Sequence, residues 1–230
     1  MTTTSTSRPA GQRTQRSWPV PAGLILLSAI PLTAGVLRTV ERAGGPAVLP
    51  PDDRFSSFPV ALFVHVLGSA LFALVGAFQF VPGLRRHHLT WHRRAGRVLV
   101  GAGLLVAVSA VWITLTYPGQ PGTGQVLYLV RLVVGPAMAA LVTLGLVAIR
   151  RRDIPAHRAW MIRAYALGLG AGTQVFTEGF GEAIFGTGIV IGDVLKVAGW
   201  VINLAVAEWV IRRPSRTPGR RPVLMGRRVS

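Results

Sequence analysis

The chain has 230 residues, of which 50% are hydrophobic and 14% are charged, and its mean hydropathy is +0.48. Soluble domains carry roughly 25% charged residues, so this composition is typical of an integral membrane protein and excludes an ordinary soluble domain. The formal net charge of +17 would favour nucleic-acid binding in a soluble protein. Here the basic residues lie in tails and short connections between apolar segments, so we expect no nucleic-acid partner. The absence of cysteine excludes disulfides, thiolate metal sites and cysteine nucleophiles.

The chain begins with a basic tail, residues 1–17, and ends with an arginine-rich tail, residues 213–230. Both are rich in Thr, Ser, Pro, Gly and Arg and have little to bury, so we expect both to be disordered. Their arginines favour contact with anionic lipid headgroups at the cytoplasmic face of the bilayer, at about 1 kcal/mol for each basic residue. Residues 18–212 are expected to form one transmembrane domain.

Between the tails, six segments meet the requirement of about 20 mainly apolar residues to cross a bilayer. They cover residues 18–40, 59–81, 98–117, 126–149, 160–180 and 188–211. The first is too long for the apolar part of a signal peptide and lacks a small-residue cleavage site, so we expect it to remain as an anchor. The sequence therefore predicts an all-α fold, an integral membrane bundle of six transmembrane helices.

The arginines are divided unequally between the two sides of this bundle. Both tails and the connections after the second and fourth spans are rich in arginine, whereas the other three connections hold only Arg42 and Arg54. The positive-inside rule then places both termini and the two basic connections in the cytoplasm, as expected for a bacterial cytoplasmic-membrane protein. An even number of spans gives the same arrangement.

The two basic segments, residues 84–97 and 149–163, resemble each other. Each joins an inward-going span to an outward-going one. The aligned pairs are Arg85-Arg86 with Arg151-Arg152, His92-Arg93 with His157-Arg158, and, after a one-residue offset, Arg97 with Arg163. This pattern favours a duplicated two-helix hairpin, spans two-three and four-five, related by a pseudo-two-fold axis along the membrane normal. Chance similarity between two basic loops is the alternative.

Four motifs resemble a known family. They are His65 with Gly76 and Gln79-Phe80, HRRAGR at 92–97, HRAWMIRAYAL at 157–167, and WVINLAVAEW at 200–209. Over these motifs, from about Val64 to Trp209, the chain resembles bacterial multi-pass membrane proteins classed as domain of unknown function 2306. Members tend to carry Thr-Leu-Arg late in the fifth span, where this chain has Gly172-Thr173-Gln174, so no role of that arginine carries over. The resemblance implies a multi-pass membrane fold and no established activity.

Ionisable groups inside a span cost roughly 2.5–3.5 kcal/mol at its centre, so they often mark a site. The outer halves of four spans contain His65, Arg131, Glu178, Asp193 and Lys196, and Gln174 shares a helix face with Glu178. We interpret these six residues as an outward-facing ligand pocket in which Arg131 and Lys196 balance the two acids and His65 responds to protons. The alternative is structural: an Asp193–Lys196 pair, an Arg131–Glu178 pair, and other groups that reach the interface.

The inner side offers a second set of candidates for binding an anion or a cofactor. It comprises His92, Arg93, Arg97, His157, Arg158 and Arg163. Because His92 and His157 stand at equivalent starts of two parallel helices, they are placed to ligate a haem b or a metal together, or to bind a phosphate with the arginines. Otherwise no metal site is expected. Helix capping and interfacial anchoring are the commoner use of such junctions.

These features predict the binding or transport of an ion, proton or small solute through the outer pocket. One alternative is a haem- or quinone-binding redox subunit that uses His92 and His157. Another is a non-catalytic assembly or sensor protein. The sequence has no Walker-type loop, no G-x-S-x-G and no H-E-x-x-H, so it gives no indication of catalysis. It leaves the substrate and the oligomeric state open.

Overall fold

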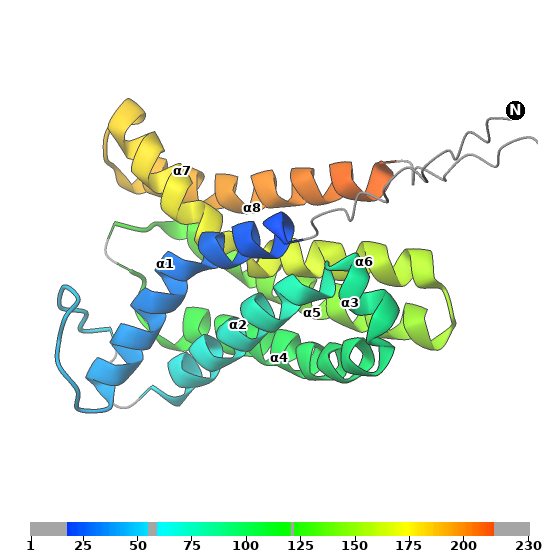
Figure 1. Ribbon diagram of the computed structural model, residues 1–230. Coiled ribbons are helices and arrows are strands. Elements are labelled where there is room, and N and C mark those ends of the chain that lie inside the picture. Colours follow the sequence, from blue (N-terminus) through cyan, green and yellow to red (C-terminus); the bar gives the residue numbers. More distant parts are fainter. Residues whose placement is uncertain (1–17, 55–58, 121, 214–230) are drawn as a thin grey trace, which may run out of the picture.

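The computed structural model describes residues 18–54, 59–120 and 122–213, which form eight helices and no strand. Figure 1 shows an elongated bundle whose long helices run between two ends. The helices are α1 (Pro19–Arg42), α2 (Val60–Gln79), α3 (Pro82–His87), α4 (Leu89–Thr116), α5 (Gln125–Arg150), α6 (Ile154–Gly168), α7 (Gly170–Phe185) and α8 (Ile189–Arg212). The predicted all-α class is confirmed. The tails predicted to be disordered, residues 1–17 and 213–230, lie outside the described residues apart from Arg213.

Within the described residues, α1, α2, α4, α5 and α8 are long and apolar enough to cross a membrane. At most 33% of the most apolar window in any of these helices is buried inside the protein. Large apolar side chains therefore face outward along all five helices, for example Leu26, Leu67, Val108, Val133 and Val201. Such a surface is stable only where lipid covers it, so the bundle is that of a multi-pass membrane protein.

The prediction of one continuous helix over residues 160–180 is wrong. The helix is interrupted at Leu169, where α6 ends and α7 begins, and neither part reaches the length of a span by itself. Two tight contacts accompany the interruption: the Trp200 indole occupies the place of a side chain at Gly170, and the Leu27 carbonyl does so at Gly172. Figure 1 shows α7 turning away from the axis of α6. In the part of the chain that the structure describes, five helices rather than six are therefore long enough to span a bilayer alone.

The basic segments are more helical than the span boundaries suggested. Residues 89–97 form the first turns of α4, and α6 begins at Ile154, after a tight turn in which Arg152 has a φ of 62°. At 1.5 Å per residue, the 28 residues of α4 extend over about 42 Å, against a hydrocarbon thickness of about 30 Å. The basic first turns of α4 therefore project beyond the apolar layer.

The core lies where α2, α4, α5 and α6 meet. It includes Phe72, Val106, Met138 and Tyr165, all less than 7% exposed. The Tyr165 hydroxyl donates a hydrogen bond to the Ala73 carbonyl over 2.7 Å, which ties α6 to α2. Outside this core, α1 packs against α2 and α7, and α8 packs against α5, α6 and α7.

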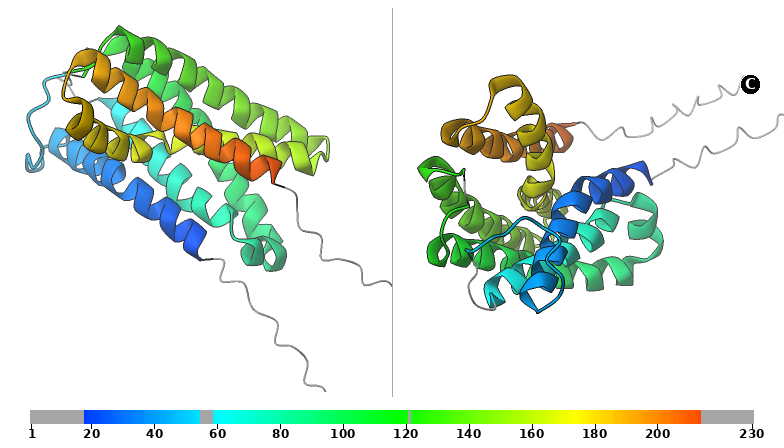
Figure 2. Two further views of the ribbon diagram at one scale, coloured as in Figure 1. Left: turned by 90° about the horizontal axis from the view of Figure 1, so that it is seen from above. Right: turned by 90° about the vertical axis from the view of Figure 1, so that its left-hand side faces the viewer.

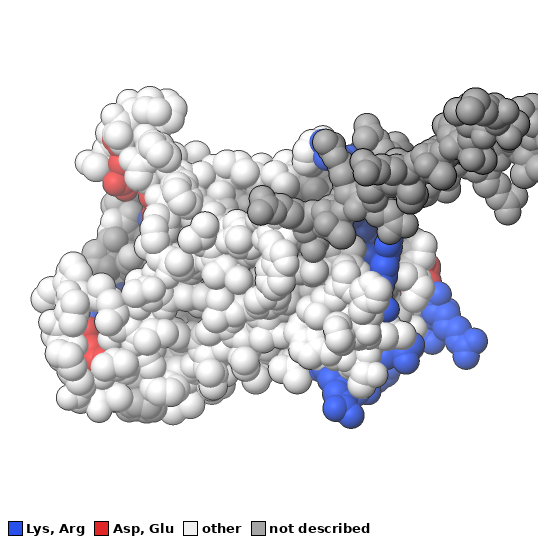
Figure 3. Space-filling view, in the orientation of Figure 1, with Lys and Arg blue, Asp and Glu red and all other residues white. Residues whose placement is uncertain are grey.

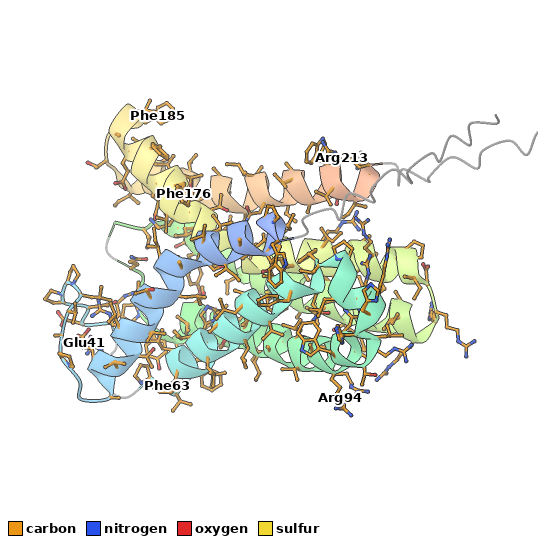
Figure 4. The ribbon with its side chains drawn as sticks, viewed as in Figure 1. Glu41, Phe63, Arg94, Phe176, Phe185 and Arg213 are labelled. Carbon is orange, nitrogen blue, oxygen red and sulfur yellow. The ribbon has the colours of Figure 1, made fainter. Side chains whose placement is uncertain are left out.

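Charge separates along the length of the bundle. On the face drawn in Figure 3, arginines gather at the end that carries α3 and the start of α4, acidic side chains gather at the opposite end, and a wide uncharged belt lies between them. Figure 4 labels Arg94 at the first end and Glu41 at the second. We call these the basic end and the acidic end. The belt between them has the character expected of a lipid-facing surface.

Candidate functional site

A cavity of about 530 Å³ lies inside the bundle, within the size range of small-molecule sites. At the acidic end it is lined by residues of the loops, Asp52, Arg54 and Gln120. At mid-bundle its lining includes Met138 and Gly168, directly before the interruption between α6 and α7. The cavity therefore runs from the acidic end to the broken helix.

Three of the six residues predicted to form the outer pocket line this cavity. They are His65 on α2, Arg131 on α5 and Gln174 on α7. Most other lining residues are apolar, so these polar groups stand out against a hydrocarbon wall. Such a wall with a few convergent polar groups is the usual form of a ligand site.

The hydrogen bonds around His65 determine what its ring presents to the cavity. Nδ1 lies 3.1 Å from the Ser109 hydroxyl oxygen, and that hydroxyl lies 2.6 Å from the Leu105 carbonyl. The single hydroxyl proton goes to the carbonyl, so Nδ1 of His65 must donate to Ser109. This network assigns the proton of a neutral ring to Nδ1 and leaves Nε2 as an acceptor. Sequence reasoning missed Ser109, whose only sequence signal is a hydroxyl within an apolar helix.

Arg131 is the unusual group of the cavity. It lies in the second turn of α5 and lines the cavity wall, and among the described residues it makes no hydrogen bond and no ion pair. An arginine in an apolar helix normally pairs with an acid, with carbonyls or with water. Its guanidinium therefore carries a charge that the surrounding protein leaves without a direct partner.

Two other arginines on the wall are neutralised by neighbours. Arg38 pairs with Glu41 at 2.7 Å and donates a second hydrogen bond to the Pro50 carbonyl. Arg54 donates hydrogen bonds to both carboxylate oxygens of Asp52, from Nε over 2.8 Å and from Nη2 over 2.6 Å. The hydrogen bonds from Arg54 hold the pKa of the Asp52 carboxyl below its usual range, so this acid stays ionised at neutral pH.

The other three predicted pocket residues do not line the cavity but connect helices. Glu178 on α7 forms an ion pair with Lys196 on α8. Asp193, which is 1% exposed, accepts hydrogen bonds from the backbone amides of Gly124 (2.8 Å) and Leu127 (3.0 Å). It thereby satisfies the first turn of α5, whose amides have no partner within the helix.

These contacts correct the pairings expected from the sequence. Neither the Asp193–Lys196 pair nor the Arg131–Glu178 pair is present among the described residues. Because α7 turns away after the interruption, Glu178 lies beside α8 and pairs with Lys196. The carboxylate of Asp193 instead accepts hydrogen bonds from amides at the start of α5. The six predicted residues are thus split between a cavity wall and a set of helix ties.

The broken helix is held by a side chain that sequence reasoning missed. Asn203 on α8 donates from Nδ2 to the Ala166 carbonyl (3.0 Å) and accepts at Oδ1 from the Thr173 hydroxyl (2.7 Å). One amide therefore bonds to both α6 and α7. Gln174 adds a hydrogen bond from Nε2 to the Lys196 carbonyl over 2.9 Å. The sequence signal for Asn203 was its place in the WVINLAVAEW motif.

The predicted inner set is only partly brought together. Arg163 forms a two-point ion pair with Glu208 of α8, at 2.5 and 3.1 Å, so it is not a free anion ligand. Nδ1 of His157 lies 2.8 Å from the Gly145 carbonyl. Nδ1 of His92 is buried without a hydrogen-bond partner in the described part of the chain, and His92 is close enough to His157 for an electrostatic interaction.

The remaining members of the inner set, Arg93, Arg97 and Arg158, are exposed. Within residues 18–54, 59–120 and 122–213, no three His, Asp or Glu side chains gather closely enough to hold a metal ion. The haem, quinone and phosphate interpretations of the inner histidines stay predictions.

Comparison with known proteins gives one match. The family model described as Predicted membrane protein (DUF2306) matches residues 62–211, which is 150 of the 230 residues. This range contains His65, Arg131, the broken helix and Asn203. No curated protein and no solved structure matches the chain. With its apolar helices and this match over about two thirds of its length, the chain belongs to the multi-pass membrane protein family Predicted membrane protein (DUF2306).

Proposed function

We propose that this protein binds a small solute in the cavity between its helices and moves it across the membrane. The observation that carries the proposal is the cavity itself, which runs from the acidic end to the interruption between α6 and α7. Discontinuous helices near the middle of a membrane are the places where transporters expose polar backbone groups to a substrate. Irregular backbone at that depth is tolerated where it lines a cavity or is buried in protein.

The proposal includes six crossings, in which α6 and α7 together form one discontinuous span. Support comes from Figures 1 and 2, where α1 starts and α8 finishes toward the basic end of the bundle. Both termini on one side require an even number of crossings. The arginines at that end favour the cytoplasm. The chain would thus have both tails inside and the mouth of the cavity outside.

The same proposal keeps the duplicated hairpin as its moving unit. α2 packs along α4, and α5 packs along α6. Each of these two pairs is joined at the basic end by an arginine-rich connection. Two similar hairpins that rock against each other would open and close the cavity at their interface.

Cysteine labelling tests the topology without a background, because the chain has no native cysteine. The test uses Thr187→Cys, between α7 and α8, and Arg152→Cys, between α5 and α6; both positions are exposed. In intact cells a membrane-impermeant maleimide should label the cysteine at 187, and it should label the one at 152 only after permeabilisation. Equal labelling of both in intact cells, or the reverse order, would refute six crossings.

A cavity-filling variant tests the binding function. Ala110 on α4 lines the cavity, whereas Val108 on the same helix is 62% exposed on the outer surface. A panel of small solutes is screened for those that raise the thermal stability of the purified protein in detergent. We expect at least one to stabilise the wild type and Val108→Leu but not Ala110→Phe, and to enter liposomes through the wild type only. The proposal is refuted if no solute in the panel stabilises the wild type, or if every stabilising solute stabilises Ala110→Phe equally.

A redox subunit is the second candidate, and the buried, unpartnered Nδ1 of His92 beside His157 is the observation that favours it. Haem between these two residues would give the purified protein a Soret band that His92→Ala abolishes. A spectrum without that band would remove the haem version.

A further inference from the structure

We propose that the ligand of the cavity is a small organic anion, with one acidic group that pairs with Arg131 and an apolar body that lies against the wall. The inference rests on the proposed function and names its substrate class.

Nearby acids are already engaged by other groups. Glu178 is paired with Lys196, and Asp193 is held by two backbone amides at the start of α5. Toward the mouth, Glu41 is paired with Arg38 and Asp52 with Arg54. Arg131 is left as a guanidinium without a direct partner among the described residues. The guanidinium is half-buried on the cavity wall, and Asp193 and Glu178 act on it only at a distance, so an anion in the cavity would be its first direct partner.

The wall decides what kind of anion fits. Leu62, Val106, Val134 and Met138 line the cavity together with several alanines and glycines. A hydrated inorganic ion would leave the apolar wall in contact with water. An organic acid would bury the same wall against its own carbon atoms, which is favourable. A volume of about 530 Å³ has room for such a body.

One further group adds to the recognition of the ligand. Nε2 of His65, in the tautomer fixed by Ser109, is an acceptor for a hydroxyl or N–H group of the ligand. The last turn of α6 and the first turn of α7 line the same part of the cavity, so the negative end of one helix and the positive end of the other meet there and largely offset each other. The site thus offers one charged donor and one neutral acceptor.

The test compares three aromatic compounds that share a shape and differ in charge: benzoate, benzamide and benzylamine. Equilibrium dialysis measures their binding to the purified full-length protein in detergent. Arg131→Gln removes the proposed partner, Arg131→Lys keeps the charge but not the planar fork, and exposed Arg94→Gln is the control at the basic end. We expect benzoate to bind at least tenfold more tightly than the other two. This advantage should be lost in Arg131→Gln, reduced in Arg131→Lys and unchanged in Arg94→Gln.

The outcomes separate the ligand class from the proposed function. If benzamide binds as tightly as benzoate, or benzylamine more tightly, and Ala110→Phe blocks that binding, the cavity is a binding site and the anion inference is overturned. If chloride or inorganic phosphate binds through Arg131 and benzoate does not, the organic part is overturned. If no compound binds in a way that Ala110→Phe blocks, the proposed function itself fails. Should Arg131→Gln not fold, Arg131→Lys decides, because an undiminished benzoate preference there contradicts recognition by a guanidinium fork.

Discussion

Replacing Asn203 should loosen the junction of α6 and α7 more than any other part of the bundle. Its amide makes two hydrogen bonds, to the Ala166 carbonyl and from the Thr173 hydroxyl. Leucine has a similar size, so Asn203→Leu removes these bonds without leaving a large void. The Ala166 carbonyl, which lies in the last turn of α6, would then lose the side-chain donor that bonds to it.

The magnitude follows from the two bonds. Hydrogen bonds between membrane helices average about 0.6 kcal/mol and reach about 1.7 kcal/mol. A buried carbonyl left without a donor costs about 1–3 kcal/mol. We therefore expect Asn203→Leu to lower the free energy of unfolding by about 2 kcal/mol, and Thr173→Val, which removes one bond, to lower it by about 0.6 kcal/mol. Because the two residues share that bond, the double variant should lose about 0.6 kcal/mol less than the sum.

Reversible unfolding in mixed micelles, with increasing sodium dodecyl sulfate and circular dichroism as the readout, measures these values. Ile202→Leu is the control, because Ile202 precedes Asn203 on α8 and is 45% exposed. A change within about 0.3 kcal/mol of wild type for Asn203→Leu would show that Asn203 does not support the interruption, and full additivity with Thr173→Val would show that the bond between these two residues contributes nothing.

Other variants test the contacts around the same junction. Gly172→Leu should destabilise the protein by about 1–3 kcal/mol in the same assay, because its side chain would meet the Leu27 carbonyl of α1; Gly23→Leu, on α1 with open space around it, should change little, and equal losses would contradict the contact. Glu178→Gln should cost about 1–2 kcal/mol by leaving Lys196 without its acid, a value reduced because both side chains are partly exposed. Adding Lys196→Met should restore most of that loss, and a double variant no more stable than Glu178→Gln would show that the pair is not a stabilising tie.

Hydropathy correctly predicted five of the six spans. It measures how apolar a window of about 20 residues is, and a helix surrounded by lipid needs that apolar composition. It could not identify the interruption at Leu169, since a window across residues 160–180 is apolar whether or not the helix is continuous. Glycines at 168, 170 and 172 suit a closely packed helix as well as a broken one. The difference lies in tertiary contacts, the Trp200 ring against Gly170 and the Leu27 carbonyl against Gly172, which no local pattern contains.

For the candidate site, the sequence identified the charged residues but not their partners. Partners depend on helix rotation and on which helices are neighbours, and periodicity along one helix leaves both open. Asp193 is instructive. The residue before α5 is Gly124, which has no side chain to cap the first turn, so the free amides there needed an acceptor from elsewhere. The sequence does show the uncapped helix start, but Lys196 three residues after Asp193 offered a nearer partner for that acid, and only the packing of α8 against α5 selects the amides instead.

The polar contacts divide the bundle into two groups of helices. α8 is tied to α5 by Asp193, to α6 by Glu208 and to α7 by Lys196, so these four helices form one polar-linked group. α2 and α4 are joined by His65 and Ser109. The groups meet through apolar core contacts and through the Tyr165 hydroxyl bond to Ala73, which lies at the deep end of the cavity. A motion that widens the cavity toward the acidic end would separate apolar surfaces while the Tyr165 bond stays intact. Such a motion would break none of these ion pairs or hydrogen bonds, and it would turn about the level at which α6 gives way to α7.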